Sequence, residues 1–134
     1  MRAEEIRIRD PFIYLEDGVY YLLGTTGNDC WNQGSNFSLY TSRDLTNFEF
    51  SGLLVEKGVL DGYKQLWAPE LHKFRGKYYL IVSLFRPDRR RGSMILAADS
   101  VRGPFVPLTG EYITPQGWLC LDATLFVSNG KPYL

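Results

Sequence analysis

A hairpin-like segment that occurs three times constrains the fold of this chain more than any other feature of its sequence. Each copy contains a β-prone run, a turn with glycine, and a second β-prone run that includes tyrosine. The copies occupy residues 9–22, 67–80 and 121–134. In the first copy the turn is Asp17-Gly18, and Asp-Gly between two β-prone runs is a strong signal for a two-residue hairpin turn. The chain is therefore predicted to be organised around three β-hairpins.

The spacing of the copies predicts a repeated structural unit. The turn glycines are Gly18, Gly76 and Gly130, so successive copies lie 58 and 54 residues apart. Each unit has room for four short strands, and no stretch shows helical periodicity over ten or more residues. The 13 glycines and the 15% aromatic content are typical of an all-β protein. A repeat of this length is typical of a β-propeller blade, which is a four-stranded antiparallel sheet packed beside its neighbours around an axis.

We expect residues 1–134 to form the N-terminal portion of a single β-propeller domain. The expected blades are blade one at about 9–54, blade two at about 67–112 and the start of blade three at about 120–134. The residues predicted to pack between blades are Phe12, Leu71 and Leu125. Roughly two and a half blades cannot close a ring, because propellers contain at least about four. The rest of the propeller is therefore expected from the same chain or from another chain.

The hairpin register singles out two acidic residues. Asp10, Ala68 and Asp122 fall on equivalent positions at the start of the three hairpins. The innermost strands of a propeller line its central cavity, so Asp10 and Asp122 are expected to project into that cavity. Asp10 precedes a proline and could instead be a turn residue that accepts backbone N–H bonds. Asp122 lies in an apolar context and could instead be a structural ion-pair partner.

The charge and the cysteines exclude several classes of function. The 15 basic and 15 acidic residues give a net charge of zero, so neither a nucleic-acid partner nor a membrane partner is expected. The arginine-rich segment 86–91 is predicted to be a solvated loop, with an arginine at the rim of a cleft as the alternative.

Cys30 and Cys120 fit no metal-ligand spacing and are predicted to be free thiols. No metal or cofactor is expected. The sequence shows neither an apolar span nor a signal peptide, so a cytoplasmic protein is expected unless a leader has been removed.

Four short motifs lie in a fixed order along the chain. They are Arg-Asp-Pro-Phe at 9–12, Ser-Arg-Asp-Leu at 42–45, Trp-Ala-Pro-Glu at 67–70 and Leu-Asp-Ala-Thr-Leu-Phe at 121–126. In their order and spacing these motifs resemble glycoside hydrolase family 43. The members of this family are five-bladed propellers that act on arabinose- and xylose-containing glycans. The resemblance covers nearly the whole chain.

The resemblance implies catalytic roles for the two aligned aspartates. Asp10 matches the family's general base, and Asp122 matches the aspartate that tunes the pKa of the acid and helps to hold the sugar. Ala123 replaces the proline that usually follows the second of these. The general acid is a glutamate that no position here matches, so it is expected beyond Leu134. Inverting glycosidases hold acid and base roughly 6.5–9.5 Å apart, which leaves room for a water. The implied reaction is the inverting hydrolysis of α-L-arabinofuranosyl or β-D-xylosyl linkages in glycans derived from plant polysaccharides.

Three further residues are candidates for contact with an oligosaccharide. Glu70 lies two residues past the position equivalent to Asp10, so its side chain points to the same face of the strand. A structural hydrogen bond is the alternative for Glu70. Trp67 and Trp31 lie beside the expected cavity, where sugar rings can stack on indole, and packing in the core is the alternative for both. His72 is predicted to serve packing.

Two other kinds of protein remain as alternatives. One is a non-catalytic propeller that binds carbohydrate or protein, and the other is a catalytically incomplete fragment. A non-catalytic module has no need of acids at the axis, so the alignment of Asp10 with Asp122 favours the enzyme.

Overall fold

The chain folds almost entirely into β-strands. The computed structural model describes residues 1–27, 31, 36–88, 90–115 and 117–134. The elements are a 3₁₀ turn, η1 (Ala3–Glu5), and the strands β1 (Ile8–Glu16), β2 (Val19–Thr26), β3 (Ser38–Ser42), β4 (Glu49–Leu53), β5 (Lys64–Phe74), β6 (Lys77–Phe85), β7 (Gly92–Ala98), β8 (Val106–Pro107), β9 (Phe126–Ser128) and β10 (Lys131–Tyr133). The described part of the chain contains no α-helix.

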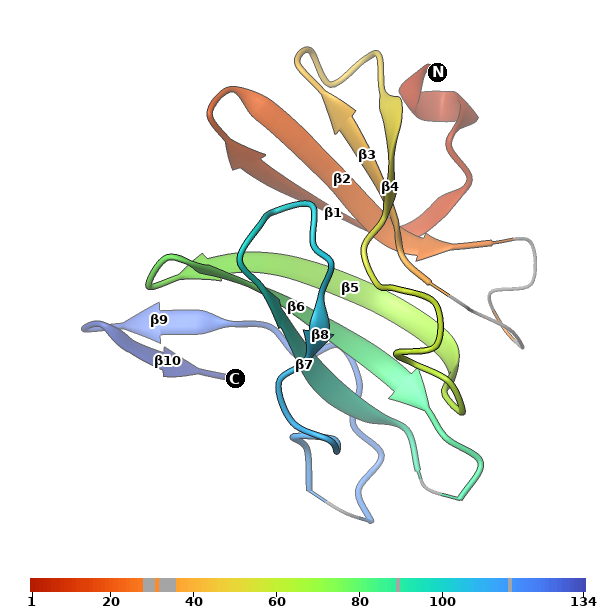
Figure 1. Cartoon of the computed structure of the whole chain (residues 1–134), viewed down its shortest axis with the longest axis vertical. Coiled ribbons are helices and arrows are strands. Elements are labelled where there is room, and N and C mark those ends of the chain that lie inside the picture. Colours follow the sequence, from red (N-terminus) through yellow and green to blue (C-terminus); the bar gives the residue numbers. More distant parts are fainter. Residues whose placement is uncertain (28–30, 32–35, 89, 116) are drawn as a thin grey trace.

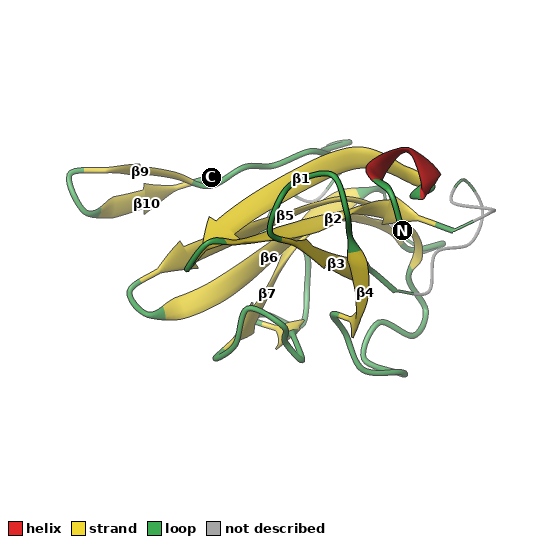
Figure 2. Cartoon of the chain, turned by 90° about the horizontal axis from the view of Figure 1, so that it is seen from above, coloured by secondary structure: helices red, strands yellow, loops and turns green. Residues whose placement is uncertain are grey.

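The strands form three antiparallel sheets that follow one another along the chain (Figure 1). Blade one has the strand order β1-β2-β3-β4, blade two has the order β5-β6-β7-β8, and β9 pairs with β10 as the start of blade three. Blades one and two meet where β1 and β2 contact β5. The predicted all-β fold of four-stranded antiparallel propeller blades is confirmed. In Figure 2, β1, β5 and the β9–β10 hairpin lie along one side, and β4 and β7 lie on the opposite side.

The three predicted hairpins share one turn geometry. At each turn the glycine and the residue before it both have positive φ angles. The pairs are Asp17-Gly18 (φ 50° and 71°), Arg75-Gly76 (φ 49° and 83°) and Asn129-Gly130 (φ 50° and 73°). Positive φ at both central residues defines the type I′ turn, whose twist matches the twist of paired strands. The repeat found in the sequence is therefore also a repeat in the backbone.

Most of the hydrophobic core lies between blades one and two. The side chains of Leu23, Leu54, Leu71 and Phe105 are fully buried there, two from each blade. The backbone N–H of Phe105 donates a hydrogen bond of 2.8 Å to the carbonyl oxygen of Leu54, which joins the outer parts of the two blades. Of the residues predicted to pack between blades, Leu71 is buried, while Phe12 and Leu125 are half-buried.

A second contact between the blades surrounds Glu16, at the turn end of the first hairpin. Its carboxylate accepts hydrogen bonds from the hydroxyls of Tyr78 (2.6 Å) and Tyr14 (3.3 Å) and forms an ion pair with Lys73. The Lys73 hydrogen bond, followed by that of Tyr78, holds the pKa of Glu16 below its ordinary value. Lys73 is 41% exposed, so water screens its charge and the ion pair contributes little. The hydrogen bond from the buried Tyr78 is therefore the larger contribution to stability.

Replacing Glu16 by glutamine should lower the free energy of unfolding by about 1–3 kcal/mol at pH 7, because the Tyr78 hydroxyl loses a charged acceptor. A carboxyl whose pKa is lower in the folded state stabilises the fold above its unfolded pKa, and this stabilisation is lost as the pH falls through the folded pKa. Urea unfolding of Glu16→Gln and of the parent protein should therefore differ at pH 7 and converge in acid. The exposed Glu56→Gln is the control and should match the parent protein at both pH values. A difference for Glu16→Gln that stays constant with pH would contradict this account.

Candidate active site

A β-bulge near the start of β1 places Asp10. Arg9 pairs with Thr25 and Phe12 pairs with Leu23, so β1 has one residue more than β2 between these two pairs. Asp10 adopts a left-handed φ of 49° within this bulge. The residue after Asp10 is a proline, which cannot donate to the strand ladder and is found in sheets at edges and bulges. Bulges next to active sites re-aim a side chain, and here the re-aimed side chain is a carboxylate.

The same device recurs in blade two. Trp67 pairs with Ser83 and Glu70 pairs with Ile81, which again leaves one extra residue on the first strand of the blade. Ala68 occupies the position of Asp10 in this second bulge and has a φ of 43°.

The third hairpin repeats the backbone conformation at the same position. Asp122, which aligns with Asp10 and Ala68 in the sequence, has a φ of 57°. The three positions that the sequence aligned therefore share a left-handed backbone, which few residues other than glycine, asparagine and aspartate adopt readily.

The predicted carboxylates surround a single cavity of about 270 Å³. Its lining residues are Asp10, Pro11, Phe12, Ala68, Pro69, Glu70 and Asp122. Asp10 and Asp122 are exposed, and Glu70 is half-buried. The structure therefore brings Asp10, Glu70 and Asp122 together, from three different strands or strand connections.

Hydroxyl groups of neighbouring strands hold the backbone around this cavity. The Thr25 hydroxyl donates to Asp10 Oδ2 (2.9 Å) and accepts from the backbone N–H of Ala68 (2.8 Å). The Ser83 hydroxyl accepts from the backbone N–H of Asp122 (2.8 Å). Thr25 of blade one thus binds the first strand of blade two. Ser83 of blade two binds the segment that leads into β9 of blade three. Neither Thr25 nor Ser83 is among the functional residues predicted from the sequence.

Glu70 has a local partner as well as a place in the cavity. Its Oε2 atom lies 2.9 Å from Nε2 of His72, two residues further along the same face of β5. The His72 ring in turn packs against Phe12, with 5.3 Å between ring centroids. This hydrogen bond fits the structural alternative for Glu70, and the packing of His72 agrees with its prediction.

The two predicted tryptophans lie against each other. The rings of Trp31 and Trp67 meet edge to face, with 5.4 Å between centroids and an interplanar angle of 82°. The guanidinium of Arg9 lies 4.1 Å from the Trp31 ring centroid, and that of Arg91 lies 3.6 Å from the Trp67 ring centroid. Trp31 is 55% exposed, so part of this aromatic surface faces solvent. Trp67 directly precedes the cavity-lining Ala68 in the sequence. Its own side chain, however, lines a neighbouring cavity together with Gln65, Phe85 and Arg91.

The prediction of a solvated loop over residues 86–91 is wrong for Arg91. Its side chain is only 7% exposed and donates to the backbone carbonyl of Gln65 (3.0 Å) and to the Gln65 side-chain oxygen. Burial lowers the pKa of Arg91 from its ordinary value. Arginine differs from lysine in that its flat guanidinium stacks on an aromatic ring while its N–H groups donate in the plane. Arg90 is exposed, as predicted for the whole segment.

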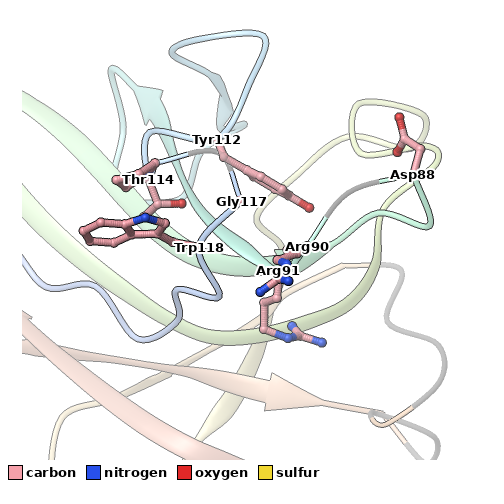
Figure 3. A pocket seen from close by; sticks show the side chains of 8 residues that line it. Asp88, Arg90, Arg91, Tyr112, Thr114, Gly117 and Trp118 are labelled. Atoms are coloured by element: carbon pink, nitrogen blue, oxygen red, sulfur yellow. The ribbon is translucent and has the colours of Figure 1, made fainter.

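A further cavity is lined in part by Arg91 (Figure 3). It has a volume of about 350 Å³ and lies between the 86–91 segment, which contributes Asp88, Arg90 and Arg91, and the connection to blade three, which contributes Tyr112 and Trp118. The Tyr112 hydroxyl is buried and has no hydrogen-bond partner among the described residues, and burial raises its pKa. The ring of Tyr112 lies so close to Gly92 that a Cβ there would meet it at 2.5 Å, so glycine is required at that position.

The remaining features of the described residues concern metal sites, membrane-spanning helices and cysteines. Over residues 1–27, 31, 36–88, 90–115 and 117–134, no group of three or more histidine, cysteine or acidic side chains could hold a metal ion. In the same residues, no helix is long and apolar enough to cross a membrane. Cys120 is a free thiol, and Cys30 lies outside the described residues.

Consecutive four-stranded blades with an acidic cavity at their inner strands define a β-propeller with a carboxylate-lined cleft. A family model described as glycosyl hydrolases family 43 matches residues 5–134. The chain belongs to this family.

Several known proteins are similar to the chain. Alpha-L-arabinofuranosidase 43 from Humicola insolens is 36% identical over 76 residues, which are 54% of this chain and 16% of that protein. The crystal structure of an endo-arabinase from Bacteroides thetaiotaomicron VPI-5482 matches with a TM-score of 0.84 and 34% identity, over 98% of this chain and 45% of that chain. The structure of an endo-1,4-beta-xylanase from the same organism matches with a TM-score of 0.73 and 25% identity, over 95% of this chain and 41% of that chain. The chain spans less than half the length of each of these relatives.

Proposed function

We propose that this chain forms part of an inverting glycoside hydrolase that cleaves α-L-arabinofuranosyl or β-D-xylosyl linkages in glycans derived from plant polysaccharides. The observation that carries the proposal is the cavity in which Asp10, Glu70 and Asp122 meet. Asp10 and Asp122 occupy equivalent left-handed positions of the first and third hairpins, and both side chains are exposed. Carboxylates gathered from separate strands around one cleft are the groups that glycoside hydrolysis requires.

In the proposed mechanism Asp10 is the general base. Its ionised carboxylate removes a proton from a water molecule, and that water attacks the anomeric carbon from the face opposite the leaving group. A glutamic acid from a later blade protonates the leaving oxygen. The role proposed for Asp122 is electrostatic: its negative charge raises the pKa of this acid by like-charge repulsion and keeps it protonated. No cofactor takes part in these steps.

Trp31 and Trp67 are proposed to bind the sugar next to the scissile bond. Ligand sites combine aromatic walls with a few polar groups that fix orientation, and here Trp67 is adjacent in sequence to the cavity-lining Ala68. Trp31 contacts Arg9 and Trp67 but is 55% exposed, so part of the Trp31 ring is accessible to a ligand. The names of the similar proteins, an arabinofuranosidase, an endo-arabinase and an endo-xylanase, support arabinose- or xylose-containing glycans as the substrate class.

The test is hydrolysis by the full-length protein of nitrophenyl α-L-arabinofuranoside and nitrophenyl β-D-xyloside, with the first-formed sugar followed by proton NMR. We expect turnover of at least one substrate and release of the sugar with the opposite anomeric configuration. Release with retained configuration would contradict the single-displacement mechanism. Binding of arabino- or xylo-oligosaccharides without any hydrolysis would instead favour a non-catalytic carbohydrate-binding propeller.

A further inference from the structure

The hydroxyl of Thr25 makes two hydrogen bonds that meet at the candidate active site. Thr25 is 2% exposed and lies in β2, opposite Arg9 and next to the bulge that carries Asp10. A hydroxyl has one hydrogen to donate, and Thr25 directs it to Asp10 Oδ2. Its oxygen accepts the backbone N–H of Ala68, in the first strand of blade two. The orientation of the hydroxyl is therefore fixed from both sides.

Ser83 repeats half of this arrangement one blade later. Thr25 and Ser83 are 58 residues apart, the same spacing as the turn glycines Gly18 and Gly76. Ser83 is 1% exposed and accepts the backbone N–H of Asp122. Both hydroxyls thus bind the left-handed residue of the following hairpin. In blade one, Thr25 also donates a hydrogen bond to Asp10 of its own blade. In blade two, the residue equivalent to Asp10 is Ala68, which has no carboxylate to accept one from Ser83.

We propose that Thr25 is a positioning residue for Asp10, fixing the orientation of the carboxylate relative to blade two. This inference rests on the proposed role of Asp10 as the general base. With Oδ2 held by Thr25, Oδ1 is the oxygen that takes the proton of the attacking water. Asp10 is exposed, and without Thr25 its carboxylate can rotate about the side-chain bonds. A displacement of about 1 Å of a reacting group can reduce a rate by roughly 100-fold, so a fixed orientation has a large effect on turnover.

The test compares Thr25→Val, which keeps the shape and removes the hydroxyl, with Thr25→Ser, which keeps the hydroxyl. In the full-length enzyme Thr25→Val should lower kcat by roughly 10- to 100-fold and leave KM within about twofold, because a misplaced base slows the chemical step rather than binding. Thr25→Ser should retain kcat within about threefold, since its hydroxyl can make both hydrogen bonds. A kcat for Thr25→Val within twofold of the parent enzyme would overturn the inference.

Two controls separate positioning from a loss of stability. Glu16→Gln also breaks a contact between blades one and two, but at the turn end of the hairpin, and should leave kcat unchanged. Thr25→Val combined with Asp10→Asn should be no slower than Asp10→Asn alone, because a residue that acts through Asp10 has no further effect once the base is removed. An additional loss in the double variant would show that Thr25 acts independently of Asp10 and would overturn the inference.

Failure of the inference can be distinguished from failure of the proposed function. A crystal structure of Thr25→Val reports the orientation of the Asp10 carboxylate without any need for turnover. A reoriented or multiply oriented carboxylate supports the inference, and an unchanged one overturns it. A parent enzyme that hydrolyses neither glycoside would overturn the proposed function.

Discussion

Asp10→Asn should lower kcat of the full-length enzyme by about 10²- to 10⁴-fold, the range expected when a general base is removed. Asparagine has almost the same shape as aspartate, tolerates the left-handed φ of 49°, and can still accept the hydrogen bond from Thr25. The substitution therefore removes the capacity to take a proton and little else. Steady-state hydrolysis of the nitrophenyl glycosides measures the change.

The chain supplies a matched control for this substitution. Asp17 also has a left-handed φ, of 50°, but it lies in the turn at the other end of the same hairpin. Asp17→Asn should retain the kcat of the parent enzyme, because asparagine is favoured in this type of turn. Wild-type turnover in Asp10→Asn would exclude Asp10 as the base and would move the search to the other carboxylates of the cavity.

Phe105→Ala should lower the free energy of unfolding by about 3–5 kcal/mol, the cost of deleting a buried phenylalanine and leaving a cavity. The side chain of Phe105 is fully buried in the core between the blades, and its backbone N–H is bonded to Leu54. The surroundings come from both blades and cannot collapse around a smaller side chain without moving one blade against the other. Urea or thermal unfolding of the full-length protein measures this loss.

Phe50→Ala is the control for that prediction. Phe50 lies on β4, the outermost strand of blade one, and is 59% exposed. Its removal should change the free energy of unfolding by about 0.5 kcal/mol or less, as is usual for surface substitutions. Equal losses for the two variants would show that the contact between blades contributes no more than the outer surface does.

The hairpins and their register could be predicted from the sequence because both depend on local signals. Turn pairs such as Asp17-Gly18 and Asn129-Gly130 specify a backbone that few other dipeptides adopt. Aligning the hairpins on these turns then put Asp10 and Asp122 at equivalent positions. The left-handed conformation shared by these two aspartates is a finding of the structure that the alignment did not predict.

The bulges could have been found but were not. Proline after Asp10 and after Ala68, in runs that otherwise read as strands, is a local signal for a bulge. With the bulges in place, the spacing of Thr25 and Ser83 would have identified the two hydroxyls opposite them.

The position of Arg91 could not have been predicted from the sequence. A run of arginines is typical of a solvated segment, and the burial of one of them depends on Trp67 and Gln65 of another strand. Such a contact is set by tertiary packing, and no local pattern encodes it. The same holds for the meeting of Trp31 with Trp67, which joins segments of two different blades.

The left-handed position at or just before the first strand of each blade has a consequence for how such a protein can evolve. When a blade is duplicated, the copy inherits a backbone site that already faces the central cavity, whether or not a functional side chain occupies it. Ala68 is an example of a site without an acid, and Asp10 and Asp122 are examples with one. A single base change converts an alanine codon into an aspartate codon. New acids can therefore be gained or lost around the axis one substitution at a time, while the architecture stays the same.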